Sequence, residues 1–600
     1  MALVPIRIPP GINNETPSLS SEPTWRDSDK VRFTAGQPEK IGGWTSDVSG
    51  IDAIKGIARS IHVWRLNNGI IMAAIGTHEK LYLFQDHVLY DITPIRETQN
   101  PLGNDPLDTT SGSAVVTVTD TGHGSTNGDY VTFSGAVCAT LVDSEVNANH
   151  QITYVDGNTY TITVTTVATG TDALDGGNVV VGAYEIPVGH VSITTNYGWS
   201  SGAWGAEEWG DARATSTLTL EMRYWSLNNF GEDLVATHEV GRIYTWVYAG
   251  SFTNRAVVLS NSPLFNDIIV VTSPDRHLVA LASETDGASQ DKLSIAWADQ
   301  ETKNTWLASA ENTAGNYTLS GGSQIMLALR SQNTTLIWTD TTLHSMQYIG
   351  PPFTFGFTEI ATNCGAISKM CAINKDTSVY WMGKEDFFLY DGVVKHIPCS
   401  VHRSIFKNLA ASQMTKITAG LITEFDEVIW FYPSSAGTEN DKYVIYNYDQ
   451  QVWCTGTMVR TAWIDTELME FPLGLKPNTM GTTSTLYHHE NGVDDDTSAM
   501  TAYIESADFD IEEGDRFFLI SRLIPDMTIV TGDVDYTLKT RRYPHSTQVT
   551  DTTSTVSAST EKVDLRVRTR QVAIRITSDA LLDDWRYGIP RIDIRKDGGR

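Results

Sequence analysis

LYLFQDHVLYDITP (81–94) contains the unit from which most of this sequence is built: a short aromatic β-run, a turn and a second run. The unit recurs up to about residue 490, as RIYTWVYAGS (242–251), LIWTDTTLHSMQYIGPP (336–352), FFLYDGVVKHIP (387–398), YVIYNYDQQVWCTG (443–456) and TLYHHENGVD (485–494). Repeats at roughly forty to sixty residues are typical of stacked or radial β-modules. Residues 57–95 hold four short runs between turn residues, which matches one propeller blade. The sequence therefore predicts an all-β fold with a β-propeller; it does not fix the number of blades, and five or six are both compatible with the repeat.

The repeat stops between Asp108 and Pro187, in a Thr/Gly/Val-rich segment with nine acidic residues and no Lys or Arg. Strand-like runs alternate with Gly-rich turns here, and Asp-Gly-Asn at 156–158 is a strong hairpin signal. About eighty residues are enough for a small sandwich. We expect residues 108–190 to form a sandwich-like β-module inserted between blades.

The N-terminal residues form an extended arm rather than a helical segment. Prolines at positions 5, 9, 10, 17, 23 and 38 leave room for edge strands at most. The arm also carries large apolar residues, so we expect it to dock on the chain's own C-terminal region or on a neighbouring subunit. The expected organisation is an arm (1–50), a first blade (51–107), the inserted tip module (108–190), the remaining blades (191–500) and a C-terminal β-domain that forms a platform with the arm (501–600).

Charge and composition exclude several classes of protein. A formal charge of −29 argues against a large surface that grips nucleic-acid phosphates. Basic residues gather in 516–600, which has fifteen Lys or Arg against eleven Asp or Glu. The five cysteines are scattered without a CxxC, which supports neither a disulfide framework, a zinc site nor a catalytic thiol. We expect a soluble chain, because no apolar run is long enough to span a bilayer and the N-terminus does not resemble a secretory signal.

Candidate chemistry is sparse. The Walker, HExxH, GxSxG and GxGxxG patterns are missing in their required contexts, and acidic residues such as Asp340 and Asp386 fall in turns. The Trp-rich stretch 196–210 is either a glycan-stacking platform or a plug at a domain boundary. His488, His489 and Asp494–Asp496 could bind a divalent cation, but a solvated acidic turn fits their spacing better. We expect no enzyme, no cofactor and no metal.

DSDKVRFTAGQPEKIGGW (27–44), preceded by PIRIPPGI (5–12), resembles the opening of tail-nozzle proteins of short-tailed bacteriophages, also called tail-hub or packaged-DNA stabilisation proteins. TSGSAVVTVTDTGHGSTNGDYVTFSGA (110–136) resembles an accessory β-module of phage structural proteins. The residues of the arm that carry the resemblance are Val31, Arg32, Phe33, Gly36, Pro38, Lys40, Gly42, Gly43 and Trp44.

The resemblance implies a structural virion protein of the tail, assembled in the host cytoplasm. It implies a homohexameric ring below the portal and adaptor rings, with a platform that contacts the adaptor and the tail fibres or spikes. The propeller would form the wall, and a protruding tip would narrow a channel that retains packaged DNA and conducts it during ejection. DNA would pass without sequence-specific contact, and contact with the host surface is open.

Two groups of residues are candidates for these roles. A lumen for DNA should avoid Lys and Arg, because each phosphate contact adds affinity. We expect the module's carboxylates to face the channel or its tip, although its direction is left open: Asp120, Asp129, Asp143, Glu145, Asp156, Asp172 and Asp175. The expected docking anchors are Trp25, Arg32, Phe33 and Trp44. The alternative functions are a receptor- or glycan-binding propeller of the tail and a propeller glycosidase.

Overall fold

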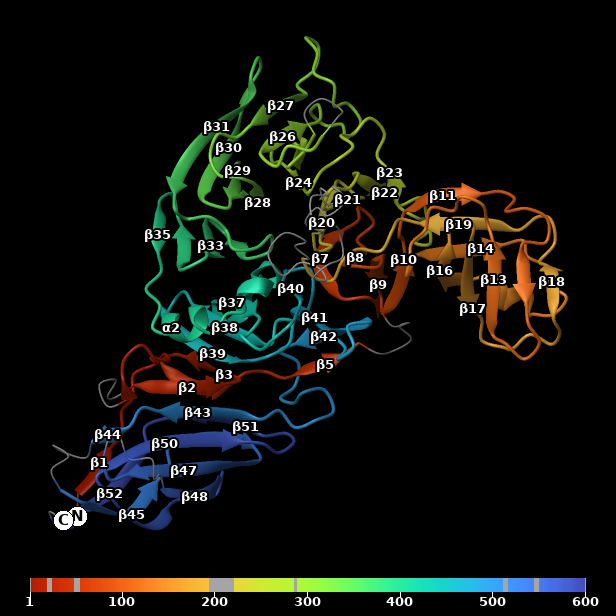
Figure 1. Cartoon of the computed structure of the whole chain (residues 1–600). Coiled ribbons are helices and arrows are strands. Elements are labelled where there is room, and N and C mark those ends of the chain that lie inside the picture. Colours follow the sequence, from red (N-terminus) through yellow and green to blue (C-terminus); the bar gives the residue numbers. More distant parts are fainter. Residues whose placement is uncertain are drawn as a thin grey trace, which may run out of the picture.

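The computed structural model describes residues 2–18, 24–47, 54–193, 221–284, 289–510, 516–543, 546 and 550–598. These residues form antiparallel β-sheets almost throughout, and the prediction of an all-β fold is confirmed (Figure 1). Helix within the described ranges is limited to short segments, namely α1 (Asp143–Val146), α2 (His402–Phe406) and the 3₁₀ turns Ala411–Lys416 and Thr423–Phe425. Among these residues, no helix is long and apolar enough to cross a membrane.

Six four-stranded sheets follow one another along the chain, each a simple up-and-down meander. The first two are β7 (Ala58–Arg65), β8 (Ile71–Thr77), β9 (Leu81–Gln85), β10 (Val88–Asp91) and β20 (Trp225–Phe230), β21 (Asp233–His238), β22 (Tyr244–Trp246), β23 (Val257–Val258). The next two are β24 (Ile268–Val271), β25 (Leu278–Leu281), β26 (Ser294–Trp297), β27 (Gly315–Thr318) and β28 (Ile325–Ser331), β29 (Thr334–Thr339), β30 (Thr342–Gly350), β31 (Thr354–Thr362). The last two are β32 (Ala372–Lys375), β33 (Ser378–Met382), β34 (Phe387–Tyr390), β35 (Val394–His396) and β36 (Thr418–Ile422), β37 (Glu427–Tyr432), β38 (Lys442–Asn447), β39 (Val452–Thr457).

A seventh sheet is built from both ends of the repeat region. It contains β40 (Ala462–Ile464), β41 (Leu473–Pro477), β42 (Thr483–His489) and, from the arm, β5 (Trp44–Ser46), while β6 (Ile54–Lys55) also pairs with β42. The first strands of the seven sheets contact one another in cyclic order, and β40 of the last sheet contacts β7 of the first. The seven sheets therefore form a closed cycle of contacts, which we call the ring.

Two tryptophans, Trp225 of β20 and Trp463 of β40, connect neighbouring sheets of the ring. Trp225 Nε1 donates to the carbonyl oxygen of Thr77 in the preceding sheet, at 3.0 Å, and Trp463 Nε1 donates to that of Leu421 at 2.8 Å. Because each indole nitrogen has a partner, the large apolar ring can be buried without leaving a polar atom unpaired.

Seven sheets are more than the five or six expected from the repeat. The sheet β24–β27 consists largely of aliphatic runs, IIVV and LVAL, which are buried on both sides and lack the aromatic signature. The seventh sheet takes an outer strand from the distant arm, so no contiguous stretch of sequence contains it. A count of aromatic units therefore misses β24–β27, whereas the unit 485–494 marks the seventh sheet without revealing its pairing with β5.

The inserted segment folds as two packed sheets beside the ring (Figure 1). One contains β11 (Ile95–Gln99), β19 (Val181–Glu185), β14 (Tyr130–Ser134) and β15 (Asn149–Gln151); the other contains β16 (Thr153–Asp156), β17 (Thr159–Thr163), β13 (Val115–Thr119), β12 (Leu107–Thr109) and β18 (Asp172–Asp175). The sheets enclose their own core, which includes Val116, Phe133, Tyr160 and Tyr184. We call residues 95–186 the module.

The arm and the C-terminal residues share three sheets. Strand β1 (Ala2–Pro5) lies beside β52 (Arg591–Lys596), then β45 (Phe518–Ile524) and β49 (Val563–Thr569). Strand β2 (Trp25–Asp29) lies beside β43 (Ala502–Ser506), then β50 (Gln571–Ser578), which also pairs with β44 (Phe509–Asp510), and then β47 (Asp533–Arg541) and β48 (Thr550–Ser557). Strands β3 (Val31–Thr34) and β4 (Gln37–Lys40) continue to β51 (Asp584–Tyr587) and β46 (Met527–Thr531).

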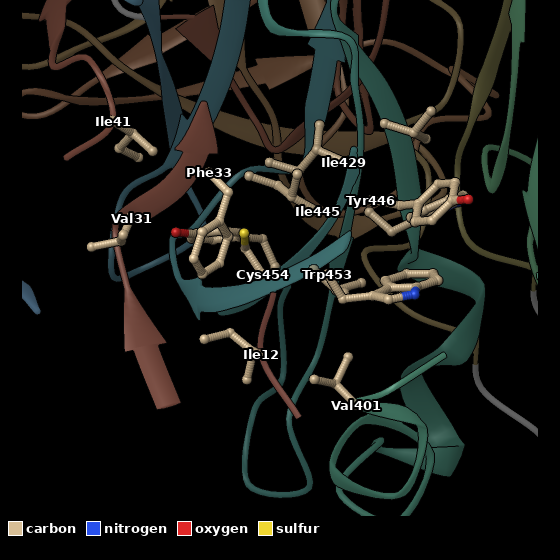
Figure 2. Close-up of a cluster of buried hydrophobic side chains, with 14 of the residues drawn as sticks. Ile12, Val31, Phe33, Ile41, Val401, Ile429, Ile445, Tyr446, Trp453 and Cys454 are labelled. Carbon is tan, nitrogen blue, oxygen red and sulfur yellow. The ribbon is translucent and has the colours of Figure 1, made fainter. Parts of the chain in front are cut away.

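The arm also packs on the ring. Figure 2 shows Ile12 and Phe33 of the arm beside Cys454 of β39, in one buried cluster with Ile429 and Ile445. This cluster is continuous with the core under the C-terminal sheets. The arm therefore joins the ring to the C-terminal sheets through a shared apolar core.

Candidate functional site

The middle of the ring contains the candidate site. A cavity of about 480 Å³ is lined by residues of five first strands, among them His62 of β7, Asn228 of β20, Ile269 of β24, Leu329 of β28 and Ala372 of β32. Because first strands meet one another around the ring, this cavity occupies its centre. A smaller cavity of about 170 Å³ shares Tyr224 and Lys369 with it.

Four charged side chains lie around Lys369, which lines the smaller cavity. Lys369 Nζ lies 3.3 Å from Asp267 Oδ2, 3.5 Å from Glu221 Oε2 and 3.7 Å from Glu239 Oε1. Lys292 Nζ lies 2.8 Å from Asp267 Oδ2 and 3.1 Å from Glu221 Oε1. These residues stand just before or after strands of three sheets, so the ring's closure brings them together. We call them the channel cluster.

Two carboxyl groups of the channel cluster differ sharply in proton affinity. Burial raises the pKa of Glu239 to about 7. Burial alone would also raise the pKa of Asp267, but Lys369 and Lys292 hold it well below its ordinary value. A neutral acid beside an ionised carboxylate is the arrangement that general acid–base chemistry requires.

Glu239 also has unused hydrogen-bonding capacity. Its Oε2 accepts from the backbone nitrogen of Tyr224 at 2.7 Å, whereas its buried Oε1 has no hydrogen-bond partner among the described residues. Buried polar atoms normally have a partner, so an orphaned carboxyl oxygen facing a cavity marks a place for a donor group. A hydroxyl group of a ligand would satisfy it.

We expect Glu239→Gln to flatten part of the pH dependence of stability. The pKa of Glu239 rises from 4.5 to about 7 on folding, so its favourable contribution is complete below pH 4.5 and is lost as the pH rises to about 7. The variant should therefore gain stability over the wild type between these values in denaturant unfolding. Glu427 has a similarly raised pKa, of about 7, so some slope should remain. A variant whose free energy of unfolding depends on pH as steeply as that of the wild type would contradict the raised pKa of Glu239.

The predicted acidic residues of the module all accept hydrogen bonds within it. Asp120, Asp129 and Asp175 are buried: Asp120 accepts from the Tyr184 hydroxyl, and Asp175 accepts from the backbone nitrogens of residues 139, 140 and 176. Asp129 accepts from the backbone nitrogens of residues 126 and 188. These three carboxylates are therefore engaged inside the module.

The other four acidic residues are more accessible. Asp143 and Asp156 are exposed, while Glu145 and Asp172 are half-buried. Each of the four accepts at least one backbone N–H of the module. A role for any of the seven in lining a DNA channel stays a prediction.

The four expected anchors are buried within the chain itself. Trp25 packs edge-on against Tyr587 with ring centroids 5.5 Å apart, and Trp44 Nε1 donates to Asp495 Oδ1 at 2.5 Å. Arg32 forms two hydrogen bonds with Glu490, at 2.9 and 2.6 Å. We expected the arm to dock on the chain's own C-terminal region or on a neighbouring subunit. These contacts are with the chain's own C-terminal region and also with its ring.

For the cluster around His488, the structure supports neither a site for a divalent cation nor a solvated acidic turn. Among the described residues, no group of three or more His, Cys, Asp or Glu side chains is suited to hold a metal ion. His489 is buried and accepts from Arg460 Nε at 2.8 Å, while Asp494 and Asp496 accept from Leu582 and Ser46. A freely solvated turn is therefore also wrong, because these carboxylates tie the arm and the C-terminal sheets to β42. Trp199, Trp204 and Trp209 lie outside the described residues.

No protein-family model matches the chain, and no curated protein matches it. Among solved structures, a phage phi92 endosialidase matches with 11% identity over 77% of this chain and 58% of its own, at a TM-score of 0.17. An exo-β-1,3-galactanase from Phanerochaete chrysosporium matches with 7% identity over 63% of this chain and 97% of its own, at 0.23. The N-terminal domain of Nup159 matches with 9% identity over 44% of this chain and 75% of its own, at 0.26.

These matches correct one expectation. The sequence predicts that the chain is not an enzyme, but two of these three similar structures are glycan-degrading enzymes, and the exclusion of enzymatic activity is withdrawn. Their TM-scores and identities are too low to transfer a substrate or a mechanism. No tail nozzle is among the three, and the chain spans 58% of the endosialidase's length.

Proposed function

We propose that this chain is a seven-bladed β-propeller protein of a short-tailed phage tail and that it forms the tail nozzle. The cyclic contacts of the seven sheets support the propeller. The observation that carries the nozzle proposal is the arm: Val31, Arg32, Phe33 and Trp44, which underlie the resemblance, are buried where the ring meets the C-terminal sheets. Burial of the resembling residues at this place supports a joint between the ring, as the proposed wall, and the C-terminal sheets, as the proposed platform.

The proposal includes partners and location. The chain would form a homohexamer in the virion tail, with its platform against an adaptor ring and tail fibres or spikes. DNA would pass through the lumen without sequence-specific contact, in keeping with a net charge of −29.

We expect reconstruction of intact virions to place six copies around the tail axis, with the module at or near the distal end. Mass measurement of the purified protein, alone and with the adaptor protein, checks assembly independently. Density for single copies away from the tail axis would sink the nozzle proposal.

A second function, glycan binding or cleavage, is favoured by the channel cluster. Paired carboxylates at a propeller's centre are used by propeller glycosidases, and Glu239 and Asp267 differ in protonation as an acid and a base must. The unpartnered Glu239 Oε1 would accept a sugar hydroxyl.

We expect this second function, if present, to depend on Glu239. Turnover or binding of a host surface polysaccharide should fall at least about 100-fold in Glu239→Ala. Replacement of the exposed Glu311 is the matched control and should leave it unchanged. Triple replacement of Trp199, Trp204 and Trp209 tests the other candidate site: it should lower glycan binding if these tryptophans form a stacking platform, and leave it unchanged if only the channel cluster binds the glycan. Equal turnover in all variants would exclude the channel cluster as the site of glycan binding or cleavage.

A further inference from the structure

One lysine of the ring forms hydrogen bonds with two side chains of the module. Lys80 immediately precedes β9 of the first sheet, and its Nζ donates to Asn149 Oδ1 at 3.0 Å and to Glu185 Oε2 at 2.9 Å. Asn149 is the first residue of β15 and Glu185 is the last residue of β19, so both belong to the module. An amine, an amide and a carboxyl group from distant parts of the sequence therefore meet where the ring joins the module.

The side-chain amide of Asn149 is held through both of its polar atoms. Its Oδ1 accepts from Lys80, and its Nδ2 donates to Glu185 Oε1 at 2.8 Å and to Thr132 Oγ1 at 3.0 Å. The amide carbon is about 1.2 Å from Oδ1, so it lies within about 4.2 Å of Lys80 Nζ. The lysine nitrogen is thus beside the amide carbon, while the carboxyl group of Glu185 is beside the amide nitrogen.

The lysine and the glutamate are almost completely shielded from water. The side chains of Lys80 and Glu185 are 2% and 1% exposed, and Lys80 Nζ lies 4.3 Å from the centre of the Tyr130 ring. Burial raises the pKa of Glu185. Because a site of low dielectric disfavours charged groups, Lys80 can pass a proton to Glu185 and become a neutral amine. A neutral lysine amine is a nucleophile, as in enzymes that form covalent intermediates through lysine.

We propose that Lys80 and Asn149 form an intramolecular isopeptide bond, with Glu185 as the catalytic residue. Lys80 Nζ gives a proton to Glu185 and attacks Cγ of Asn149, so that the Nζ–Cγ bond forms. Glu185 then protonates Nδ2 and the Cγ–Nδ2 bond breaks. Nζ gives up two protons in all, and the amide nitrogen leaves as ammonium. Glu185 ends in the protonation state in which it began, and nothing is oxidised or reduced.

Asp91 is the competing partner for Lys80, because its Oδ2 lies only 2.7 Å from Nζ. Burial alone would raise the pKa of Asp91, but Lys80 and Arg255 hold it below its ordinary value. Asp91 is therefore ionised, and a carboxylate resists attack by an amine because both carry electron density toward the new bond. The Asn149 amide is uncharged and has an acid beside its leaving nitrogen, so the geometry points to Asn149.

The test is mass spectrometry of the denatured full-length wild-type chain, intact and after digestion with trypsin. We expect the intact mass to be about 17 Da below that of the unmodified chain, which is the loss of one ammonia molecule. Asparagine can also lose ammonia to its own backbone. The decisive observation is therefore a branched peptide in which Lys80, left uncut by trypsin, is joined to Asn149.

Two variants and one control test the roles of the residues. Glu185→Gln should abolish the branched peptide, because an amide of the same size cannot take up the lysine proton. Asn149→Ala should abolish it by removing the carbon that is attacked. Lys55→Arg is the matched control: Lys55 lies over the same Tyr130 ring, at 4.9 Å, but it is exposed, and this variant should retain the branched peptide.

Three results would contradict parts or all of the proposal. A wild type that trypsin cuts at Lys80 and that yields no branched peptide would overturn it, whether or not the variants fold. A branched peptide joining Lys80 to Asp91, with loss of about 18 Da as water, would overturn the choice of Asn149. A branched peptide formed equally well in Glu185→Gln would remove Glu185 from the reaction.

Discussion

Arg32→Ala is expected to lower the free energy of unfolding by about 3–5 kcal/mol, because it leaves buried carboxylates without their counter-charge. The Arg32 side chain is 2% exposed and the side chain of Glu427, 3.4 Å away, is 1% exposed. The guanidinium also bonds Glu490 through two nitrogens and lies 3.7 Å above the ring of Phe425. One side chain of the arm thus neutralises carboxylates from the sixth and seventh sheets of the ring.

The free energy of unfolding lost in Arg32→Ala should be larger at high pH than at low pH. Burial raises the pKa of Glu427 to about 7 even with Arg32 present, and removing Arg32 raises it further. A raised carboxyl pKa favours the folded state at low pH, so Arg32→Ala should be less destabilising at pH 5 than at pH 8. Denaturant unfolding at the two pH values measures the difference.

Arg276→Ala is the control for this experiment. Arg276 pairs with Glu301 at 2.9 Å, but both side chains are about half exposed, so its removal should cost less than about 1 kcal/mol at either pH. If the two arginine variants lose the same stability, the buried triad does not hold the arm to the ring.

The ring illustrates what sequence patterns do and do not contain. The aromatic runs predict strands because each strand's alternation and its turn residues are local properties. The unit 485–494 marks the seventh sheet, but the pairing of its β42 with β5 is missed because these strands lie at opposite ends of the ring's sequence. Strand pairing across such a distance is specified by the closed architecture and leaves no local period.

The channel cluster was beyond sequence reasoning for a related reason. Glu221, Glu239, Asp267, Lys292 and Lys369 share no motif and span almost 150 positions. Each lies at the end of a strand, where a charged residue normally indicates a solvated turn. Only the closure of the ring turns these ends toward one another. By contrast, the Asp-Gly-Asn hairpin signal at 156–158 is local: it marks the turn between β16 and β17, where Asp156 accepts from the backbone nitrogens of residues 158 and 159.

A second buried network joins the module to the first sheet, and its central residue gives the other large expected effect. Lys80 Nζ, in the first sheet, lies 2.7 Å from Asp91 Oδ2, 3.0 Å from Asn149 Oδ1 and 2.9 Å from Glu185 Oε2. Asn149 and Glu185 belong to the module, and the side chains of Lys80 and Glu185 are 2% and 1% exposed. Arg255 of the second sheet also reaches Glu185, at 3.0 Å.

Lys80→Met should therefore destabilise the junction by about 3 kcal/mol, at the lower end of the range for a broken buried pair, because Arg255 still compensates part of the charge. Hydrogen exchange should accelerate in β14, β15 and β19, while the sixth sheet, which packs on the arm, stays protected. Lys55→Met is a closely matched control: Lys55 and Lys80 lie over the same Tyr130 ring, at 4.9 and 4.3 Å, but Lys55 is exposed. Equal exchange in the two variants would mean that the connecting strands alone orient the module, and that its direction is free to change.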